Sequence, residues 1–209
     1  MTRARFISLE GGEGVGKSTQ LAALAEALKG RGIDPLLTRE PGGSTGAEAI
    51  RALLLGGDET RWNPRAEALL FAAARSDHIE RTIRPAIETG RWVVCDRFVD
   101  SSLAYQGEAG RLGIDAVRDL HRFGSRDYLP DRTLVLMLDE AEGAVRARVR
   151  DGHAGDRIGG RPPTYHAAVL AGFRSMAASE PERVRLVDAS GSAATVTARL
   201  LYALGDLLP

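Results

Sequence analysis

Residues 11–18 read Gly-Gly-Glu-Gly-Val-Gly-Lys-Ser and match the phosphate-binding loop pattern G-x-x-x-x-G-K-[ST] at every fixed position. An apolar run, Phe6–Leu9, precedes the loop, and a helical pattern with one apolar face follows over residues 21–28. The pattern is informative only between a strand and a helix, and the flanking residues predict both. Glycines let the backbone amides surround a phosphate, and the helix N-terminus adds partial positive charge. The stretch therefore predicts a nucleoside triphosphate site, with Lys17 at the terminal phosphates and Ser18 on Mg²⁺; a glycine-rich turn with a chance lysine is the competing interpretation.

Length and composition limit what this chain can be. Its 209 residues suit one α/β domain, residues 1–209. Basic and acidic residues number 28 each, so no net charge draws the chain to nucleic acid or an anionic membrane. Glu10 and Glu13 interrupt any signal peptide, and no apolar run is long enough to cross a bilayer. The single cysteine, Cys95, excludes an intramolecular disulfide, suits a cytoplasmic location and is expected to be buried and inert.

Strand-like and helix-like patterns alternate along the chain. Asn63-Pro64 predicts a helix start, and Pro85 predicts a break or kink in the helical stretch that follows. The alternation predicts a parallel sheet with helices on both faces and ligands at the carboxyl ends of the strands. The apolar runs that predict strands are Phe6–Leu9, Pro35–Thr38, Trp92–Cys95, Thr133–Leu138 and Val184–Val187.

One stretch, residues 151–163, is rich in Gly and Pro and carries Arg157 and Arg161. It follows a run of arginines at Arg146, Arg148 and Arg150. One interpretation is a solvated surface loop after a charged helix end. The other is a short mobile lid, residues 148–164, whose arginines close over phosphates. The phosphate loop elsewhere in the chain favours the lid.

Asp96 and Arg97 come directly after an apolar strand-like run. Beside a phosphate loop, an Asp in this place commonly holds Mg²⁺ or its water, and an Arg clamps an acceptor phosphate through two hydrogen bonds. Taken alone, the pair is more typical of a surface salt bridge. Residues 38–43 also follow a predicted strand, and their Pro and glycines predict a tight turn that would bring Arg39 near a ligand; taken alone, they favour only a turn.

Phe71 and Arg75 are four residues apart in a helical pattern and therefore share one face. A ring that stacks on a flat base, with an arginine one turn later, would make a pyrimidine pocket. From these residues alone, a core Phe with an outward-reaching Arg is the favoured interpretation. The polar residues of Ser101–Gln106 would contact a base or sugar, or only cap a helix.

Taken together, these segments resemble the thymidylate kinases of the bacterial type. The most specific piece is the block Asp96-Arg97-Phe98-x-x-Ser101-Ser102-x-Ala104-Tyr105-Gln106, because many unrelated enzymes share the phosphate loop. The other matching pieces are residues 10–19, residues 38–43, Phe71 with Arg75, and residues 156–158. The resemblance implies a three-layer P-loop NTPase fold with a five-stranded parallel sheet. It also implies the reaction ATP + dTMP → ADP + dTDP, with Mg²⁺ as cofactor and a homodimer as the assembly.

The resemblance also assigns roles to residues of the dTMP site. It implies that Phe71 stacks on thymine, that Arg75 bonds the thymine carbonyl, and that Ser102 or Gln106 helps read the base. It implies that Tyr105 crowds the 2′ position of the sugar. The residues implied around the phosphate and the 3′-hydroxyl are Arg39, Pro41, Arg51, Arg97 and Glu10, with Glu10 also near the metal shell.

On the ATP side, the resemblance implies that Arg146 flanks adenine and that the Asp188-Ala189-Ser190 turn approaches it from the other side. The phosphate-loop motif and the carboxylate at the strand end predict Ser18 and Asp96 as the metal ligands. The phosphate loop lacks the basic residue that one subclass carries inside it, so the lid is expected to supply the catalytic arginine, with Arg150 the first candidate and Arg157 the second. The implied ATP-binding loop consists of Gly11, Gly12, Glu13, Gly14, Val15, Gly16, Lys17, Ser18 and Thr19.

The sequence departs from the family pattern after Asp156-Arg157-Ile158, where Gly159-Gly160-Arg161-Pro162-Pro163 stands in place of the expected acidic residues. The chemistry itself needs little from the protein, because the acceptor is a phosphate already ionised near neutral pH. Catalysis then becomes positioning plus charge stabilisation, with Lys17, Arg97 and a lid arginine as catalytic residues.

Three other functions compete with this interpretation. The nearest is a kinase of the same fold acting on another pyrimidine nucleotide or on a nucleoside, which only the details of the pocket distinguish. A GTP-dependent switch needs an [NT]-K-x-D motif, which cannot occur because the only lysines are Lys17 and Lys29. A nucleic-acid-dependent ATPase is disfavoured by the zero net charge and by the absence of an aromatic-basic stripe.

Overall fold

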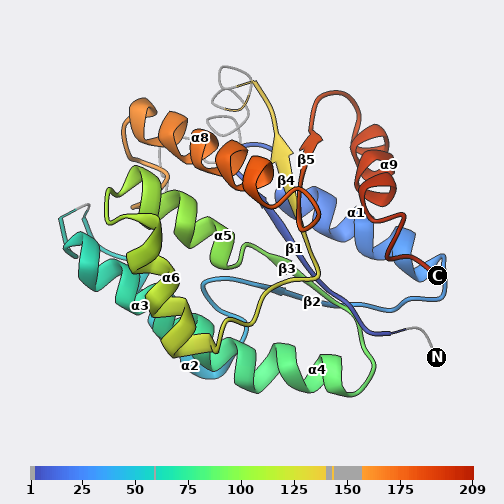
Figure 1. Cartoon of the computed structure of the whole chain (residues 1–209), viewed down its shortest axis with the longest axis horizontal. Helices are drawn as coiled ribbons and strands as arrows, with labels where there is room; N and C mark the ends of the chain where they lie inside the picture. Colours follow the sequence, from blue (N-terminus) through green and yellow to red (C-terminus); the bar gives the residue numbers. More distant parts are fainter. Residues whose placement is uncertain (1–2, 59, 140–142, 144–156) are drawn as a thin grey trace.

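The computed structural model describes residues 3–58, 60–139, 143 and 157–209 (Figure 1). At its centre is a sheet of five parallel strands in the order β2-β3-β1-β4-β5. The predicted five-stranded parallel sheet is therefore confirmed, with each strand within two residues of its expected bounds. The strands are β1 (Phe6–Gly11), β2 (Leu36–Arg39), β3 (Val93–Asp96), β4 (Arg132–Met137) and β5 (Val184–Asp188).

Successive residues of the central strand face opposite layers, as in any strand. Ile7 belongs to the apolar cluster shared with α1 (Lys17–Lys29) and α9 (Ala193–Ala203), which pack against each other. Phe6 belongs to the cluster on the other face, where α5 (Val99–Ser102), α6 (Ile114–Ser125) and α8 (Pro163–Ser179) lie (Figure 1). Both faces of the sheet are thus covered, which gives the three layers expected of a parallel sheet.

A long helical stretch beyond the sheet edge carries the residues of the predicted base pocket. It follows α2 (Thr45–Leu55) and consists of α3 (Pro64–His78), a π-helical segment η1 (Ile79–Ile83) and α4 (Arg84–Glu88). Asn63 caps α3 by accepting a hydrogen bond from the Ala66 amide, as predicted. The predicted interruption is also confirmed: the helix widens into π geometry just before Pro85, which has no N–H to donate.

A second π-helical segment, η2 (Leu103–Ala109), directly continues α5. It lies between α6 and α8 and packs on both of them. Through α5 and η2, the chain leaves β3 and passes beside the phosphate loop before it turns into α6. The predicted motif from Asp96 to Gln106 is therefore one continuous segment at the carboxyl end of the sheet.

Cys95 is fully buried in β3, and burial raises the pKa of its thiol well above the ordinary value. This agrees with the expectation of an inert core residue. In the part of the chain that the structure describes, no helix combines the length and the apolar character needed to span a membrane.

Candidate active site

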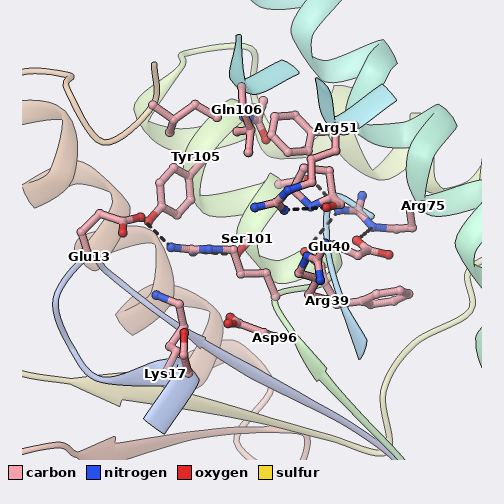
Figure 2. A pocket seen from close by; sticks show the side chains of 18 of the residues that line it. Glu13, Lys17, Arg39, Glu40, Arg51, Arg75, Asp96, Ser101, Tyr105 and Gln106 are labelled. Atoms are coloured by element: carbon pink, nitrogen blue, oxygen red, sulfur yellow. Dashed lines mark hydrogen bonds and ion pairs between the residues drawn. The ribbon is translucent and has the colours of Figure 1, made fainter. Parts of the chain in front are cut away.

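One cavity opens at the carboxyl ends of β1, β2 and β3 (Figure 2). The sequence pattern predicts ligand binding at this edge of the sheet. It extends from the phosphate loop to α3 and has a volume of about 240 Å³. The predicted site residues that line it are Glu13, Gly16, Lys17, Ser18, Thr19, Arg39, Pro41, Arg51, Phe71, Arg75, Asp96, Arg97, Ser102, Tyr105 and Gln106.

The phosphate loop connects β1 to α1 in the predicted context. Gly11, Gly14 and Gly16 have φ values of 139°, 72° and 88°, a region that favours glycine. A Cβ on Gly11 would lie 2.6 Å from the Leu136 carbonyl oxygen, so this glycine also permits a close approach to β4. The loop geometry thus favours glycine at Gly11 and Gly16, which the sequence pattern fixes, and also at Gly14, which it leaves variable.

Lys17 begins α1, and its ammonium turns back over the loop. Its Nζ donates to the carbonyl oxygens of Gly12 at 2.7 Å and Gly11 at 3.2 Å. Burial lowers the pKa of Lys17 to about 8, and repulsion from Arg97 acts in the same direction. A nearby anion would favour the charged form, so this lysine is suited to phosphate oxygens.

Asp96 ends β3 and points into the cavity near Lys17 (Figure 2). Its Oδ1 is buried and has no hydrogen-bond partner. Ser18 lines the same cavity. An unpartnered carboxylate oxygen in a cavity that a hydroxyl also lines fits a hard cation such as Mg²⁺, which typically takes one or two protein oxygens together with substrate phosphates and water.

Arg97 follows Asp96 and has a φ of 67°, which is uncommon for a residue other than glycine. Its guanidinium donates to Glu13 Oε1 at 2.7 Å, to the Gly11 carbonyl oxygen at 3.1 Å and to Ser101 Oγ at 3.2 Å. It also lies 5.0 Å from the centre of the Tyr105 ring. The unusual backbone conformation therefore accompanies a side chain held across the phosphate loop.

Glu10 holds the turn that follows Arg97 and is not among the residues that line the cavity. It is fully buried, and its carboxylate accepts hydrogen bonds from the Phe98 amide at 2.6 Å and from Ser101 Oγ at 2.5 Å. Burial, together with the nearby charge of Asp100, raises the pKa of Glu10 to about 8. Of the two glutamates at the loop, Glu13 alone reaches the cavity.

At the other end of the cavity, α3 supplies Phe71 and Arg75 side by side. Arg75 is almost fully buried, and its guanidinium donates to Glu40 Oε2 at 2.7 Å and to Ser102 Oγ at 2.8 Å. His78 approaches the second oxygen of Glu40 at 3.1 Å. The favoured interpretation of an outward-reaching arginine is wrong here, because a buried carboxylate holds Arg75 at the cavity wall.

Arg39 and Arg51 line the cavity near the turn at Pro41. Arg39 is exposed and pairs with Glu48 at 3.0 Å. Arg51 donates to the Pro41 carbonyl oxygen at 2.7 Å. The tight turn predicted for residues 38–43 therefore brings two arginines from β2 and α2 to the same wall.

Arg157 takes a different position from the cavity residues. Its side chain is buried and donates to the Leu54 carbonyl oxygen at 3.0 Å and to Glu67 Oε2 at 2.6 Å. The neighbouring Ile158 lines the cavity. Arg146, Arg150 and residues 148–156 of the predicted lid lie outside the described residues.

Sequence reasoning missed Glu40 and Glu67, the two buried carboxylates that hold the base end of the cavity. Glu40 stands in the stretch Thr38–Gly43, which the sequence analysis treated as a turn. Glu67 precedes Phe71 by four residues, so helical spacing places both on one face of α3. That spacing was the available signal, although a glutamate on a helix is usually solvated.

The comparisons with known proteins agree with this geometry. The family model described as Thymidylate kinase matches residues 9–200. A thymidylate kinase of Rhizorhabdus wittichii is 62% identical over 205 residues, covering 98% of this chain and 99% of the relative, and that of Afipia carboxidovorans is 49% identical, covering 95% and 87%. The crystal structure of thymidylate kinase from Ehrlichia chaffeensis superposes with a TM-score of 0.76 at 29% identity, covering 96% of this chain and 98% of that one. A family match over nearly the whole chain, with the fold and cavity described above, means that this protein belongs to the thymidylate kinase family.

Proposed function

We propose that this protein transfers the terminal phosphoryl group of ATP to dTMP and forms ADP and dTDP. The observation that carries the proposal is one cavity that joins the phosphate loop at Lys17 to a wall formed by Phe71 and Arg75. A donor phosphate chain and an acceptor nucleotide would meet there end to end. The family relationship supports the same reaction.

Arg97 is the proposed clamp on the acceptor phosphate. Its guanidinium is held on the loop by Glu13 and the Gly11 carbonyl oxygen, so the charge is pre-positioned. Arg39 and Arg51, which also line the cavity, would offset the repulsion between dTMP and ATP. Because the acceptor is an ionised phosphate, no strong general base is needed.

Lys17 and the loop amides are the proposed binding groups for the phosphates of ATP. Negative charge on the transferring group would be stabilised by Lys17 and by a lid arginine. Arg150 is the first candidate for that arginine and Arg157 the second. Arg157 would have to exchange its contacts with Glu67 and Leu54 for phosphate oxygens, which favours Arg150.

Ser18 and Asp96 are the proposed protein ligands for Mg²⁺. The unpartnered Asp96 Oδ1 supports this assignment. A bound Mg²⁺ would supply charge neutralisation at the phosphate oxygens. Asp96 also faces Lys17, so the carboxylate helps to keep the ammonium protonated.

For the base, we propose that Phe71 stacks on thymine and that Arg75 donates to its carbonyl oxygen. Tyr105, packed under the Arg97 guanidinium, would exclude a 2′-hydroxyl. Ser102 and Gln106 both line the wall and are the proposed base readers. Glu10 is assigned a positioning role in place of a substrate contact, since its carboxylate holds the turn that carries Arg97.

We also propose a cytoplasmic homodimer. Leu69 on α3 is 56% exposed and Phe123 on α6 is 94% exposed, and these two helices pack on each other. A second copy would cover these apolar side chains. Light scattering should give twice the monomer mass, and Phe123→Glu should shift it toward one chain; a monomeric parent protein would contradict the dimer.

The test of the reaction is an ADP-release assay with Mg-ATP and a panel of acceptors. The panel contains dTMP, dUMP, dCMP, CMP and deoxythymidine. Turnover that strongly prefers dTMP supports the proposal. Preference for another acceptor would keep the kinase reaction but remove the assigned roles of Phe71, Arg75 and Tyr105.

A further inference from the structure

Glu67 is a buried carboxylate on α3 that joins the base wall to the start of α8. It is 2% exposed. Its Oε2 accepts hydrogen bonds from Arg157 and Arg161, each at 2.6 Å, and its Oε1 accepts one from Gln106 Nε2 at 3.0 Å. One oxygen is thus bonded to two guanidinium groups, while the other contacts a residue that lines the cavity.

This arrangement fixes the orientation of the Gln106 amide. A carboxylate paired with two arginines accepts hydrogen bonds and donates none, so the amide must turn its NH₂ end toward Glu67. The carbonyl oxygen of Gln106 is then the acceptor left for a ligand. A neutral side chain at position 67 would impose no such choice, because a second amide can present either end.

Arg75 complements this acceptor with a donor. Its guanidinium is held by Glu40 (Figure 2). It is also held by Ser102, which lies on the helical turn before Gln106. The wall therefore combines an arginine, which only donates, with an amide oxygen, which only accepts. Thymine and uracil match this pair through a carbonyl at C4 and an N–H at N3, whereas cytosine has an amine at C4 and an acceptor at N3.

We propose that Glu67 is a positioning residue that makes the cavity select thymine-type bases over cytosine-type bases by fixing the Gln106 amide. This inference rests on the proposed function. The competing role for Glu67 is purely structural, as an anchor for Arg157 and Arg161. The two roles differ in one measurable respect, because an anchor has no reason to alter the choice of base.

The decisive pair of acceptors is dTMP and 5-methyl-dCMP. Both carry the 5-methyl group, and they differ only in the hydrogen-bonding groups at N3 and C4. In Glu67→Gln, the ratio of kcat/KM for dTMP to that for 5-methyl-dCMP should fall about tenfold, mainly through KM, since one correctly paired hydrogen bond is at stake. The ratio is independent of how much of the variant is folded. Glu108→Gln, which removes an exposed carboxylate from η2, is the matched control and should leave the ratio unchanged.

The exchange variant Glu67→Gln/Gln106→Glu separates the two roles further. In this variant the position 67 amide donates to the new carboxylate and offers its carbonyl oxygen to the arginines, while an acceptor again faces the base. The dTMP preference should recover to within about threefold of the parent. An unchanged ratio in Glu67→Gln, or a lost ratio that the exchange does not restore, would overturn the proposal. A parent protein without dTMP turnover would instead overturn the proposed function itself.

Discussion

Glu10 provides a prediction about stability that does not depend on the enzyme's substrates. Its pKa is raised from 4.5 to about 8 by burial and by the charge of Asp100. The folded protein therefore binds the proton more tightly than the unfolded chain does. By linkage, the tighter proton binding stabilises the folded state, and this contribution is fully present below pH 4.5 and is lost as the pH rises through 8. A rise of this size corresponds to about 5 kcal/mol at most, and relaxation around the carboxylate would reduce it.

The perturbation is Glu10→Gln, which keeps an acceptor for the Phe98 amide and cannot ionise. The assay is urea unfolding of parent and variant from pH 5 to pH 8.5. The result is read as the difference in unfolding free energy between variant and parent at each pH. His121, whose pKa burial lowers to about 4, makes the stability of both proteins rise with pH below 6.5, and the difference removes this shared trend. As the pH rises across this range, the unfolding free energy of the variant should increase relative to that of the parent by a few kcal/mol.

A constant difference between parent and Glu10→Gln would refute the reasoning, because it would mean that Glu10 is ionised in the folded state throughout. The exposed carboxylate of Glu108 supplies the control. The difference in unfolding free energy between Glu108→Gln and the parent should be the same at every pH.

Four further predictions concern catalysis. Lys17→Ala should lower kcat at least about a hundredfold in steady-state assays, and a near-normal rate would remove the phosphate-loop assignment. Asp96→Asn should raise the Mg²⁺ concentration needed for half-maximal rate about tenfold, measured by titration at fixed ATP, while an unchanged requirement would exclude Asp96 as a ligand. Phe71→Ala should raise KM for dTMP about tenfold with little change in thermal midpoint; lost stability at unchanged KM would restore the core interpretation. Arg150→Ala should lower kcat far more than dTMP affinity, and the same result for Arg157→Ala instead would reassign the lid arginine.

The fold was predictable because its signals are local. Each strand is a short apolar run, and the helix start at Asn63-Pro64 is a direct consequence of capping. Gly11, Gly14 and Gly16 stand where φ is positive. The position of the cavity followed from the same signals, since the carboxyl ends of parallel strands meet at one edge of the sheet.

The distribution of carboxylates was not predictable in the same way. Glu10 and Glu13 are three residues apart, but Glu10 ends up buried within β1 while Glu13, in the loop that follows, reaches the cavity. Glu40 and Glu67 are held by arginines 35 and 90 or more residues away in sequence. Pairing over such distances depends on tertiary packing, which sequence periodicity does not encode.

The cations of the phosphate end are already paired within the protein, with Lys17 on loop carbonyls and Arg97 on Glu13. A phosphate mimic must break these contacts before it makes its own, so its net binding free energy is smaller than the new contacts alone would give. A small uncharged molecule confined to the end lined by Phe71, Arg75 and Gln106 would leave them intact. For inhibitor design, the base end of the cavity is therefore the better starting point. Extending an inhibitor toward the loop improves its affinity only if the new contacts outweigh the free energy lost by separating Arg97 from Glu13.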